Sequence, residues 1–235
     1  LRFPGMFENE KKGLLKLNKS GVKTPQVIFE RSKDNLAFFA LEYIQNGDFG
    51  NWELFGEKLA SLHTNKNEFF GLDYDNYIGS LRQVNKKENN WKGFYSNQRL
   101  LHLTKFAFDK ELLSKTDSKK MEELCNKLDT YLPFAKPSLI HGDLWSGNLI
   151  FDGQGKPVFI DPAIYYGHPE MDWAMLSLFG SYPETAMKSY CNIIPLENNY
   201  FEREKIYQLY PLLVHLILFG RSYYRDISET LNFYG

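Results

Sequence analysis

Apolar residues recur at the spacing of amphipathic helices over much of the chain. In residues 6–17 apolar and charged positions alternate at helical intervals, and Trp52, Phe55 and Leu59 fall three and four residues apart. Further helices are expected at 91–115, at 118–132 and, in two or three pieces, after residue 171. The pattern therefore predicts a largely helical chain.

Strands are expected early in the chain, where Val, Ile, Phe and Tyr are concentrated. Residues 25–29 and 36–44 have this composition, and the charged stretch 30–35 is expected to turn between them. Residues 72–90 are polar, with several Asn and Lys, and are expected to form a surface loop. Together with the helices, these strands predict an α+β protein.

The segment Gln-Asn-Gly-Asp at 45–48 is a cluster of residues that break regular structure. It marks a candidate hinge between two parts of the chain. We expect a small N-terminal part, residues 1–47, with one helix and two strands, and a larger, mostly helical C-terminal part, residues 48–235.

A second hairpin brings two polar side chains together. The apolar runs Leu-Ile-Phe and Val-Phe-Ile flank the turn-rich segment 152–156, and if Phe151 faces Val158, then Asn148 faces Asp161. Side chains directly across an antiparallel pair lie about 5 Å apart at Cβ. Amide and carboxylate oxygens are hard ligands that suit Mg²⁺. A register slip of one residue would place either Asn148 or Asp161 on the opposite face of the hairpin. Either residue could instead be an ordinary turn residue.

Asp143 precedes Asn148 by five positions in a glycine-containing loop. A carboxylate there could accept a hydrogen bond from a substrate hydroxyl, and the spacing Asp-x-x-x-x-Asn followed by an Asp on a strand is that of kinase catalytic loops. His141 fits the same pattern as a support for the loop. Taken singly, Asp143 could be a helix cap or an Asx turn, but the combination favours phosphoryl transfer.

Composition excludes several classes of protein. The 28 basic and 29 acidic residues leave a net charge of −1, with no basic excess to bind nucleic acid or anionic membranes. The longest apolar run, 212–219, is interrupted by His215 and is far shorter than the roughly 20 residues of a membrane span. Cys125 and Cys191 provide neither a disulfide framework nor a zinc site, which favours a reducing compartment, the cytoplasm.

The segment 141–148, His-Gly-Asp-Leu-Trp-Ser-Gly-Asn, strongly resembles the fructosamine kinase (ketosamine-3-kinase) family. The bare spacing His-x-Asp-x-x-x-x-Asn is shared with aminoglycoside and choline kinases, and the full octapeptide is the more specific signal. Further segments that agree with the family, over nearly the whole chain, are 6–10, 41–43, 59–63, 70–71, 75–76, 160–163, 166–172 and 219–220.

The resemblance implies a two-lobed, protein-kinase-like fold with ATP bound between the lobes. Asp143 would be the catalytic base or hydroxyl-orienting residue, and Asn148 and Asp161 would hold Mg²⁺. Glu10 matches the helix glutamate that pairs with a phosphate-binding lysine. The hinge whose backbone meets adenine matches residues 42–44, namely Glu42, Tyr43 and Ile44.

The resemblance also implies a substrate and a role. The family phosphorylates the sugar 3-hydroxyl of ketosamines, free or protein-bound, which are glycation products. The phosphorylated adduct decomposes and frees the amine, so the implied role is deglycation, a form of protein repair.

One part of the family pattern is missing from the sequence. The glycine-rich phosphate loop and the strand with the lysine would precede Glu10, but only nine residues do so, and none is a lysine. We therefore expect the N-terminal lobe to be incomplete in this chain and the natural protein to be longer by a few tens of residues. Pro169 stands where many relatives have a basic residue.

Candidate substrate contacts follow the proposed metal carboxylate or lie within the loop. Tyr166, His168 and Glu170 could line a sugar pocket, and Trp145 could stack on the sugar or pack in the core. For Asp172 we favour a hydrogen bond to the catalytic loop.

Two rival functions remain open. The chain could be a kinase for an aminoglycoside or an amino alcohol such as choline, which a substrate panel would distinguish. It could also be a catalytically silent relative that binds a nucleotide or a partner, which the missing lysine segment would explain. The oligomeric state is not predicted.

Overall fold

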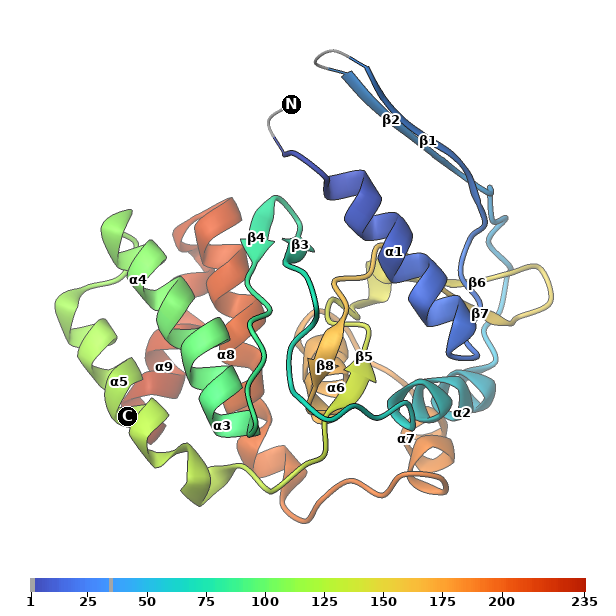
Figure 1. The fold of residues 1–235 in the computed structure, drawn as a ribbon. Coiled ribbons are helices and arrows are strands. Elements are labelled where there is room, and N and C mark those ends of the chain that lie inside the picture. The colour runs from blue at the N-terminus through green and yellow to red at the C-terminus, as the bar shows by residue number, and fades with distance from the viewer. Residues whose placement is uncertain (1–2, 34–35) are drawn as a thin grey trace.

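A computed structural model describes residues 3–33 and 36–235. The N-terminal part contains helix α1 (Met6–Lys19) and a hairpin of strands β1 (Val27–Lys33) and β2 (Leu36–Leu41). In Figure 1 α1 and this hairpin lie on one side of the larger helical part. The expected helix and both strands are confirmed.

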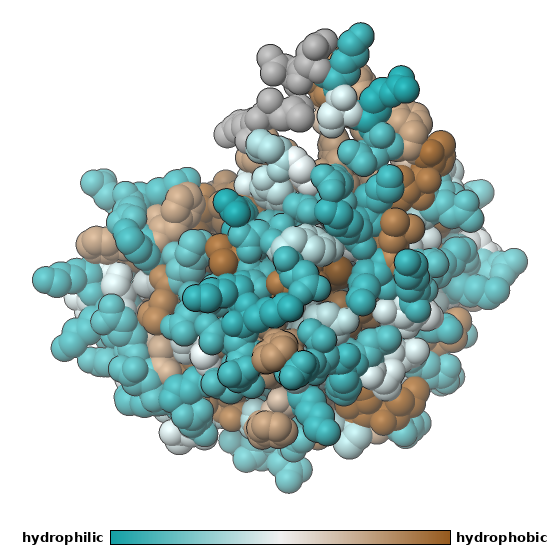
Figure 2. Space-filling model, viewed as in Figure 1, coloured by the Kyte–Doolittle hydropathy of each residue, from teal (hydrophilic) through white to brown (hydrophobic). Residues whose placement is uncertain are grey.

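The bounds of the first strand differ from the prediction. β1 includes charged residues of the stretch that we expected to turn, and Glu30 pairs with Phe39 across the hairpin. The composition misled because β1 is largely exposed, so it has no alternation of apolar and polar residues to read. Ile28 and Phe38 of this hairpin are exposed. Figure 2 shows hydrophobic surface over the hairpin, on a face that is otherwise mostly hydrophilic.

The C-terminal part is mostly helical, as expected. Its helices are α2 (Trp52–His63), α3 (Trp91–Phe94), α4 (Leu101–Asp109), α5 (Lys115–Tyr131), α6 (Glu170–Leu178), α7 (Glu184–Cys191), α8 (Tyr200–Phe219) and α9 (Tyr224–Tyr234). A π-helical turn, η1 (Tyr95–Leu100), joins α3 to α4, and short 3₁₀ turns occur at η2 (Ser146–Asn148) and η3 (Arg221–Tyr223). Four α-helices follow residue 169, where we expected two or three. No helix of the described segments has the length and apolar character to cross a membrane.

Three short strand pairs lie between these helices. They are β3 (Asn76–Ile78) with β4 (Leu81–Gln83), β5 (Ser138–Ile140) with β8 (Tyr165–Gly167), and β6 (Leu149–Phe151) with β7 (Pro157–Phe159). The prediction of a surface loop over 72–90 was therefore wrong for β3 and β4. These strands carry buried Asn76 and Gln83, and a polar strand of three residues has no hydrophobic pattern.

The β6–β7 hairpin exists, but its predicted register was wrong by one residue. Phe151 pairs with Pro157 instead of Val158. The reason is the turn: the backbone N–H of Asp152 donates to the carbonyl of Lys156 at 3.0 Å, which closes the hairpin one residue earlier than we assumed. Asn148 consequently lies opposite Ile160, whose N–H donates to its carbonyl at 3.1 Å, and Asp161 lies one residue beyond.

Two apolar clusters hold the strand pairs in place. One consists mainly of residues from α3 to α5, α8 and α9, and the other joins α2, α6 and α7 to β5, β6 and β7. The β5–β8 pair lies between them, with Ile140 and Tyr165 in the first cluster and Leu139 in the second. The loop after β5 and the segment before β8 are thus attached to both apolar clusters.

Candidate active site

A cavity of about 220 Å³ lies where α1, β3, the loop after β5 and the segment after β7 meet. Its lining includes Glu10 and Asn9 from α1, Asn76 from β3, and Asp143 and Asp161 from the two loops. Among the described residues that line it there is no Lys, Arg or His. The structure therefore brings three of the predicted site carboxylates to one cavity, in spite of the error in register.

Asp143 is a largely buried carboxylate in the loop. Burial, followed by the negative charge of Asp161, raises the pKa of Asp143 to about 7. The Nδ2 of Asn148 opposes this shift by donating to Asp143 Oδ2 at 3.2 Å. Asp143 is thus an acid that a neighbouring cation would stabilise in its ionised form.

The backbone of Asp161 is left-handed, with φ of 49°. This conformation costs most residues other than glycine about 1–2 kcal/mol, although Asp and Asn tolerate it better, and the following Pro162 restricts the backbone further. The turn interrupts the alternation of side-chain directions along the strand. Asp161 lines the cavity although it is not the cross-strand partner of Asn148.

Glu10 enters the cavity from the N-terminal part. Burial raises the pKa of Glu10 to about 7, and the charge of Asp161 acts in the same direction. No lysine or arginine of the described segments forms an ion pair with Glu10.

Asn148 is buried behind Asp143 and is not part of the cavity lining. Its Nδ2 donates to the backbone carbonyl of Asp143 at 2.9 Å as well as to the carboxylate. Both bonds use the amide nitrogen, so neither occupies Oδ1, the atom that could ligate a metal ion.

His141 supports the loop, as the sequence indicated. Its Nδ1 accepts from the backbone N–H of Asp143 at 3.3 Å, which leaves Nε2 to donate to the carbonyl of Ile160 at 3.0 Å. Burial lowers the pKa of His141, so the imidazole is neutral at pH 7. The neutral ring ties the loop to the segment between β7 and Asp161.

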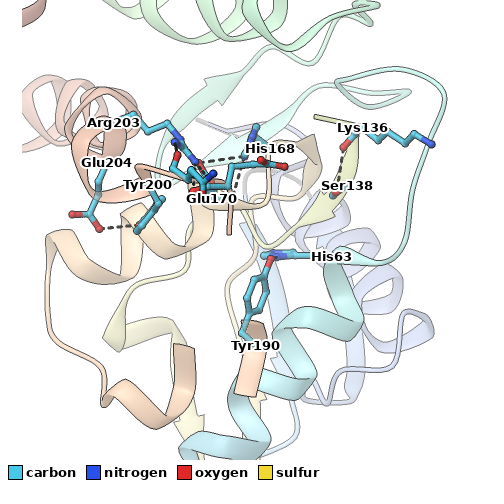
Figure 3. A network of polar contacts seen from close by, with 11 residues as sticks. His63, Lys136, Ser138, His168, Glu170, Tyr190, Tyr200, Arg203 and Glu204 are labelled. Atoms are coloured by element: carbon cyan, nitrogen blue, oxygen red, sulfur yellow. Dashed lines mark hydrogen bonds and ion pairs between the residues drawn. The ribbon is translucent and has the colours of Figure 1, made fainter. Parts of the chain in front are cut away.

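Asp172 anchors the same loop from α6, which confirms our expectation for this residue. Its carboxylate accepts from the N–H groups of His141 at 2.7 Å and Gly142 at 2.9 Å. His63 Nε2 lies 3.1 Å from the Asp172 carboxylate, and His63 Nδ1 lies 2.8 Å from the hydroxyl of Tyr190. Figure 3 shows Tyr190 directed toward His63 between α7 and α2.

The predicted hinge residues 42–44 follow β2 at the junction of the two parts. The N–H of Glu42 donates to the carbonyl of Gln26 at 2.8 Å, and its carboxylate accepts from the N–H of Gln26 at 3.1 Å. The side chain of Tyr43 is 87% exposed, and Ile44 is partly buried. Glu42 is thus tied to the segment before β1 through both its backbone and its side chain, whereas the side chain of Tyr43 lies in solvent.

Of the candidate substrate residues, Trp145 lies on the loop after β5 and Tyr166 lies in β8. Trp145 is 39% exposed and covers Gly147 of the same loop. Tyr166 is partly buried in β8, and the ammonium group of Lys16 lies 5.7 Å from the centre of its ring. Neither residue lines the carboxylate cavity.

His168 and Glu170 lie at the opposite end of β8, away from Asp143. Glu170 forms a buried ion pair with Arg203, with Oε2 2.8 Å from Nε, and the three residues lie together in Figure 3. Burial lowers the pKa of His168 to about 3. The structure therefore does not bring these two residues to the cavity that contains Asp143 and Asp161.

The acidic lining of the cavity fits a divalent cation such as Mg²⁺. Three acidic side chains meet there, and the pKa values of Asp143 and Glu10 are raised by burial and by the charge of Asp161. A divalent cation would remove this repulsion, and carboxylate oxygens are the ligands that Mg²⁺ prefers.

Sequence reasoning missed the polar side chains of β3 and β4 that touch this site. Asn76 and Gln83 are buried and donate to the carbonyls of Ile164 and Ala163, just beyond Asp161. The available signals were the excess of amides in 72–90, which we interpreted as a loop, and the agreement of residues 75–76 with the family.

Known proteins resemble this chain along almost its whole length. A model of the fructosamine kinase family matches residues 2–234. A probable ketoamine kinase of Lactiplantibacillus plantarum is 37% identical over 227 residues, which cover 96% of this chain and 80% of that protein. The crystal structure of a candidate fructosamine-3-kinase from Thermobifida fusca superposes with a TM-score of 0.88 at 36% identity, covering 97% of this chain and 80% of that one.

A more distant solved structure supports the fold alone. The ADP-bound aminoglycoside phosphotransferase APH(2'')-Ib superposes with a TM-score of 0.56 at 19% identity, over 94% of this chain and 81% of that one. The kinase-like fold expected from the sequence is thereby confirmed.

Proposed function

Because the chain belongs to the fructosamine kinase family, we propose that it transfers the γ-phosphoryl group of ATP to the 3-hydroxyl of a ketosamine. The observation that carries this proposal is the cavity in which Asp143 and Asp161 meet Glu10. The phosphorylated product would decompose and release the amine, so the protein would act in deglycation. We place this activity in the cytoplasm, which agrees with the two free cysteines.

Asp143 acts on the acceptor. Its ionised carboxylate accepts a hydrogen bond from the sugar hydroxyl and orients that oxygen toward the phosphoryl group. The same carboxylate can take up the hydroxyl proton as the bond to phosphorus forms. His141 and Asp172 hold the loop backbone, so that this carboxylate is positioned before the substrate arrives.

Asp161 and Asn148 would hold Mg²⁺, through a carboxylate oxygen and the amide Oδ1. The ion supplies neutralisation of the charge on the transferred phosphoryl group. Asn148 also keeps the Asp143 carboxylate in place through its Nδ2. The backbone of Glu42, Tyr43 and Ile44 would bind adenine, and Glu10 would face the phosphates with a cation between.

Two aromatic residues near the site are candidates for contacts with the acceptor sugar. Trp145 is exposed on the loop that carries Asp143 and could stack on the sugar ring. Tyr166 could contribute an aromatic face as well. For His168 and Glu170, their burial and their absence from the lining of the cavity favour a structural role.

A substrate panel tests the function. The full gene product is incubated with Mg²⁺-ATP and fructosyl-lysine, a glycated peptide, an aminoglycoside or choline, and ADP release and product mass are measured. We expect the mass of the two ketosamine substrates to increase by about 80 Da, the mass of HPO₃ added by one phosphoryl transfer. The masses of the aminoglycoside and choline should not change. Phosphorylation of the aminoglycoside or choline alone would contradict the proposal, and no turnover with any substrate would favour a silent nucleotide-binding relative.

A further inference from the structure

The strained backbone at Asp161 is fixed on both sides by hydrogen bonds. On the N-terminal side, Ile160 donates its N–H to the carbonyl of Asn148 at 3.1 Å. On the C-terminal side, the N–H of Ala163 donates to the carbonyl of His141 at 3.0 Å. A left-handed residue persists only where its surroundings determine it, so these contacts decide where the Asp161 carboxylate lies.

Two buried amides of the β3–β4 pair complete this fixation. Gln83 Nε2 donates to the carbonyl of Ala163 at 3.0 Å, and Asn76 Nδ2 donates to the carbonyl of Ile164 at 2.9 Å. Both side chains are at most 3% exposed. The segment after Asp161 is therefore held between the catalytic loop on one side and two side-chain amides on the other.

The orientation of the two amides is itself determined by their neighbours. Asn76 Oδ1 accepts from Gln83 Nε2 and from Asn85 Nδ2, each at 2.8 Å. The hydroxyl of Tyr210 donates to Gln83 Oε1 at 2.6 Å. A flipped Gln83 would place its oxygen against the carbonyl of Ala163, which cannot donate. The network therefore has one arrangement.

A buried arginine terminates the network. Arg99 is fully buried and donates from Nη2 to Asn85 Oδ1 at 2.7 Å and from Nη1 to the carbonyl of Val84. Its guanidinium lies over the rings of Tyr165 and Tyr210, at 4.1 and 5.2 Å from their centres. No carboxylate of the described residues forms an ion pair with it. A buried cation that relies on amides and aromatic rings keeps those groups in place, because losing them would leave its charge uncompensated.

We infer that Gln83 and Asn76 are positioning residues that hold Asp161 in the geometry required for metal-dependent nucleotide binding. They act on the backbone of residues 163 and 164 and contact neither metal nor nucleotide. The inference rests on the proposed function, because it assigns Asp161 to the metal. Residues that orient metal ligands in this way commonly change metal affinity about 10- to 100-fold when they are replaced.

Equilibrium ADP binding with and without Mg²⁺ tests the inference without measuring turnover. The Gln83→Met variant of the full gene product keeps the volume of the side chain but loses its donor and acceptor. We expect its Mg²⁺-dependent gain in ADP affinity to fall at least about tenfold, with the affinity measured in EDTA unchanged.

Gln208→Met is the matched control. Gln208 is also 2% exposed and also donates from Nε2 to a backbone carbonyl, that of Ala174. We expect the control to lose stability but to keep the Mg²⁺-dependent gain. Equal gains in both variants and the wild type would overturn the inference and leave the proposed function intact. A wild-type protein with no Mg²⁺-dependent gain would overturn the metal role of Asp161 and the inference together.

A milder variant keeps the test decisive if Gln83→Met does not fold. Tyr210→Phe removes only the hydrogen bond to Gln83 Oε1, and we expect it to reduce the Mg²⁺-dependent gain by a factor of roughly three. Amide hydrogen exchange over residues 160–165 provides a second reading. Exchange at Ala163 is expected to be faster in Tyr210→Phe than in Gln208→Met, and equal rates together with an unchanged gain would overturn the inference.

Discussion

The carboxylate of Asp172 accepts a hydrogen bond from the backbone N–H of His141 at 2.7 Å, across 31 positions of sequence. The same carboxylate also accepts from the next N–H of the loop. A carboxylate that accepts two backbone bonds in a buried site is a strong anchor, because either donor would be costly to leave unpaired. The loop that carries Asp143 is therefore held by its first two residues.

Replacing Asp172 distinguishes an effect of the loop position on turnover from an effect of general stability on turnover. In Asp172→Asn the new amide nitrogen faces a backbone N–H, so we expect a loss of about 1–3 kcal/mol in stability and a fall in kcat of about 100-fold. Asp117→Asn is the control, because Asp117 accepts from the N–H and hydroxyl of Ser114 at a distant helix cap. Urea unfolding and steady-state kinetics measure both quantities. A similar fall in kcat for the control would show that the effect is one of stability.

Asp143→Asn is expected to stabilise the protein while abolishing turnover. The pKa of Asp143 is raised from 3.8 to about 7 in the folded state, so ionisation at pH 8 costs folding free energy that an amide avoids. We expect a gain of at least about 1 kcal/mol at pH 8. The gain shrinks as the pH falls toward 4, where the folded carboxyl is protonated. Thermal melts at pH 8 and pH 5 check the sign, and unchanged turnover would reject the assigned role.

Substitutions at Asp161 separate charge from backbone strain. Asp161→Ala removes the carboxylate but also places alanine at a φ of 49°, whereas Asp161→Asn tolerates the left-handed region and removes the charge alone. We expect both variants to lose at least about tenfold of the Mg²⁺-dependent ADP affinity, and only the alanine variant to lose stability. Calorimetric titration and thermal melts measure these effects. Wild-type Mg²⁺-ADP affinity in Asp161→Asn would contradict the metal role.

His168 makes the folded protein sensitive to acid. Its pKa is lowered from 6.5 to about 3, so the unfolded state binds a proton first and stability falls as the pH decreases below 6.5. From pH 7 to pH 5 this single group contributes a loss of about 2 kcal/mol. His168→Asn keeps an acceptor for the N–H of Glu170 and is expected to lose about 2 kcal/mol less than the wild type over that range. Parallel losses in the two proteins would exclude His168 as the cause.

The parts of the site that are local in sequence could be predicted. The spacing of Asp143 and Asn148 and the hairpin that returns to Asp161 indicated the correct loops, because each lies within about twenty residues of the others. Helix α1 and helix α2 followed from their apolar spacing. The roles assigned to the individual site residues stay predictions.

The rest of the fold and of the site depends on contacts that no local sequence pattern encodes. The register of β6 and β7 is set by the bond from Asp152 to Lys156 in the turn, and the length of the apolar runs does not reveal it. The strands β3 and β4 are held by buried amides, and their sequence is as polar as that of a loop. His168 and Glu170 follow Asp161 closely, but β8 carries them to its far end, where Arg203 pairs with Glu170.

Glu10 belongs to α1, whereas Asp143 and Asp161 belong to the larger part of the molecule. Like charges on opposite walls push those walls apart, and two positive charges placed between them reverse the sign of that force. If Mg²⁺ and the nucleotide bind in this cavity as proposed, the ion would draw the two walls together, and nucleotide binding would be thermodynamically coupled to closure of the cavity.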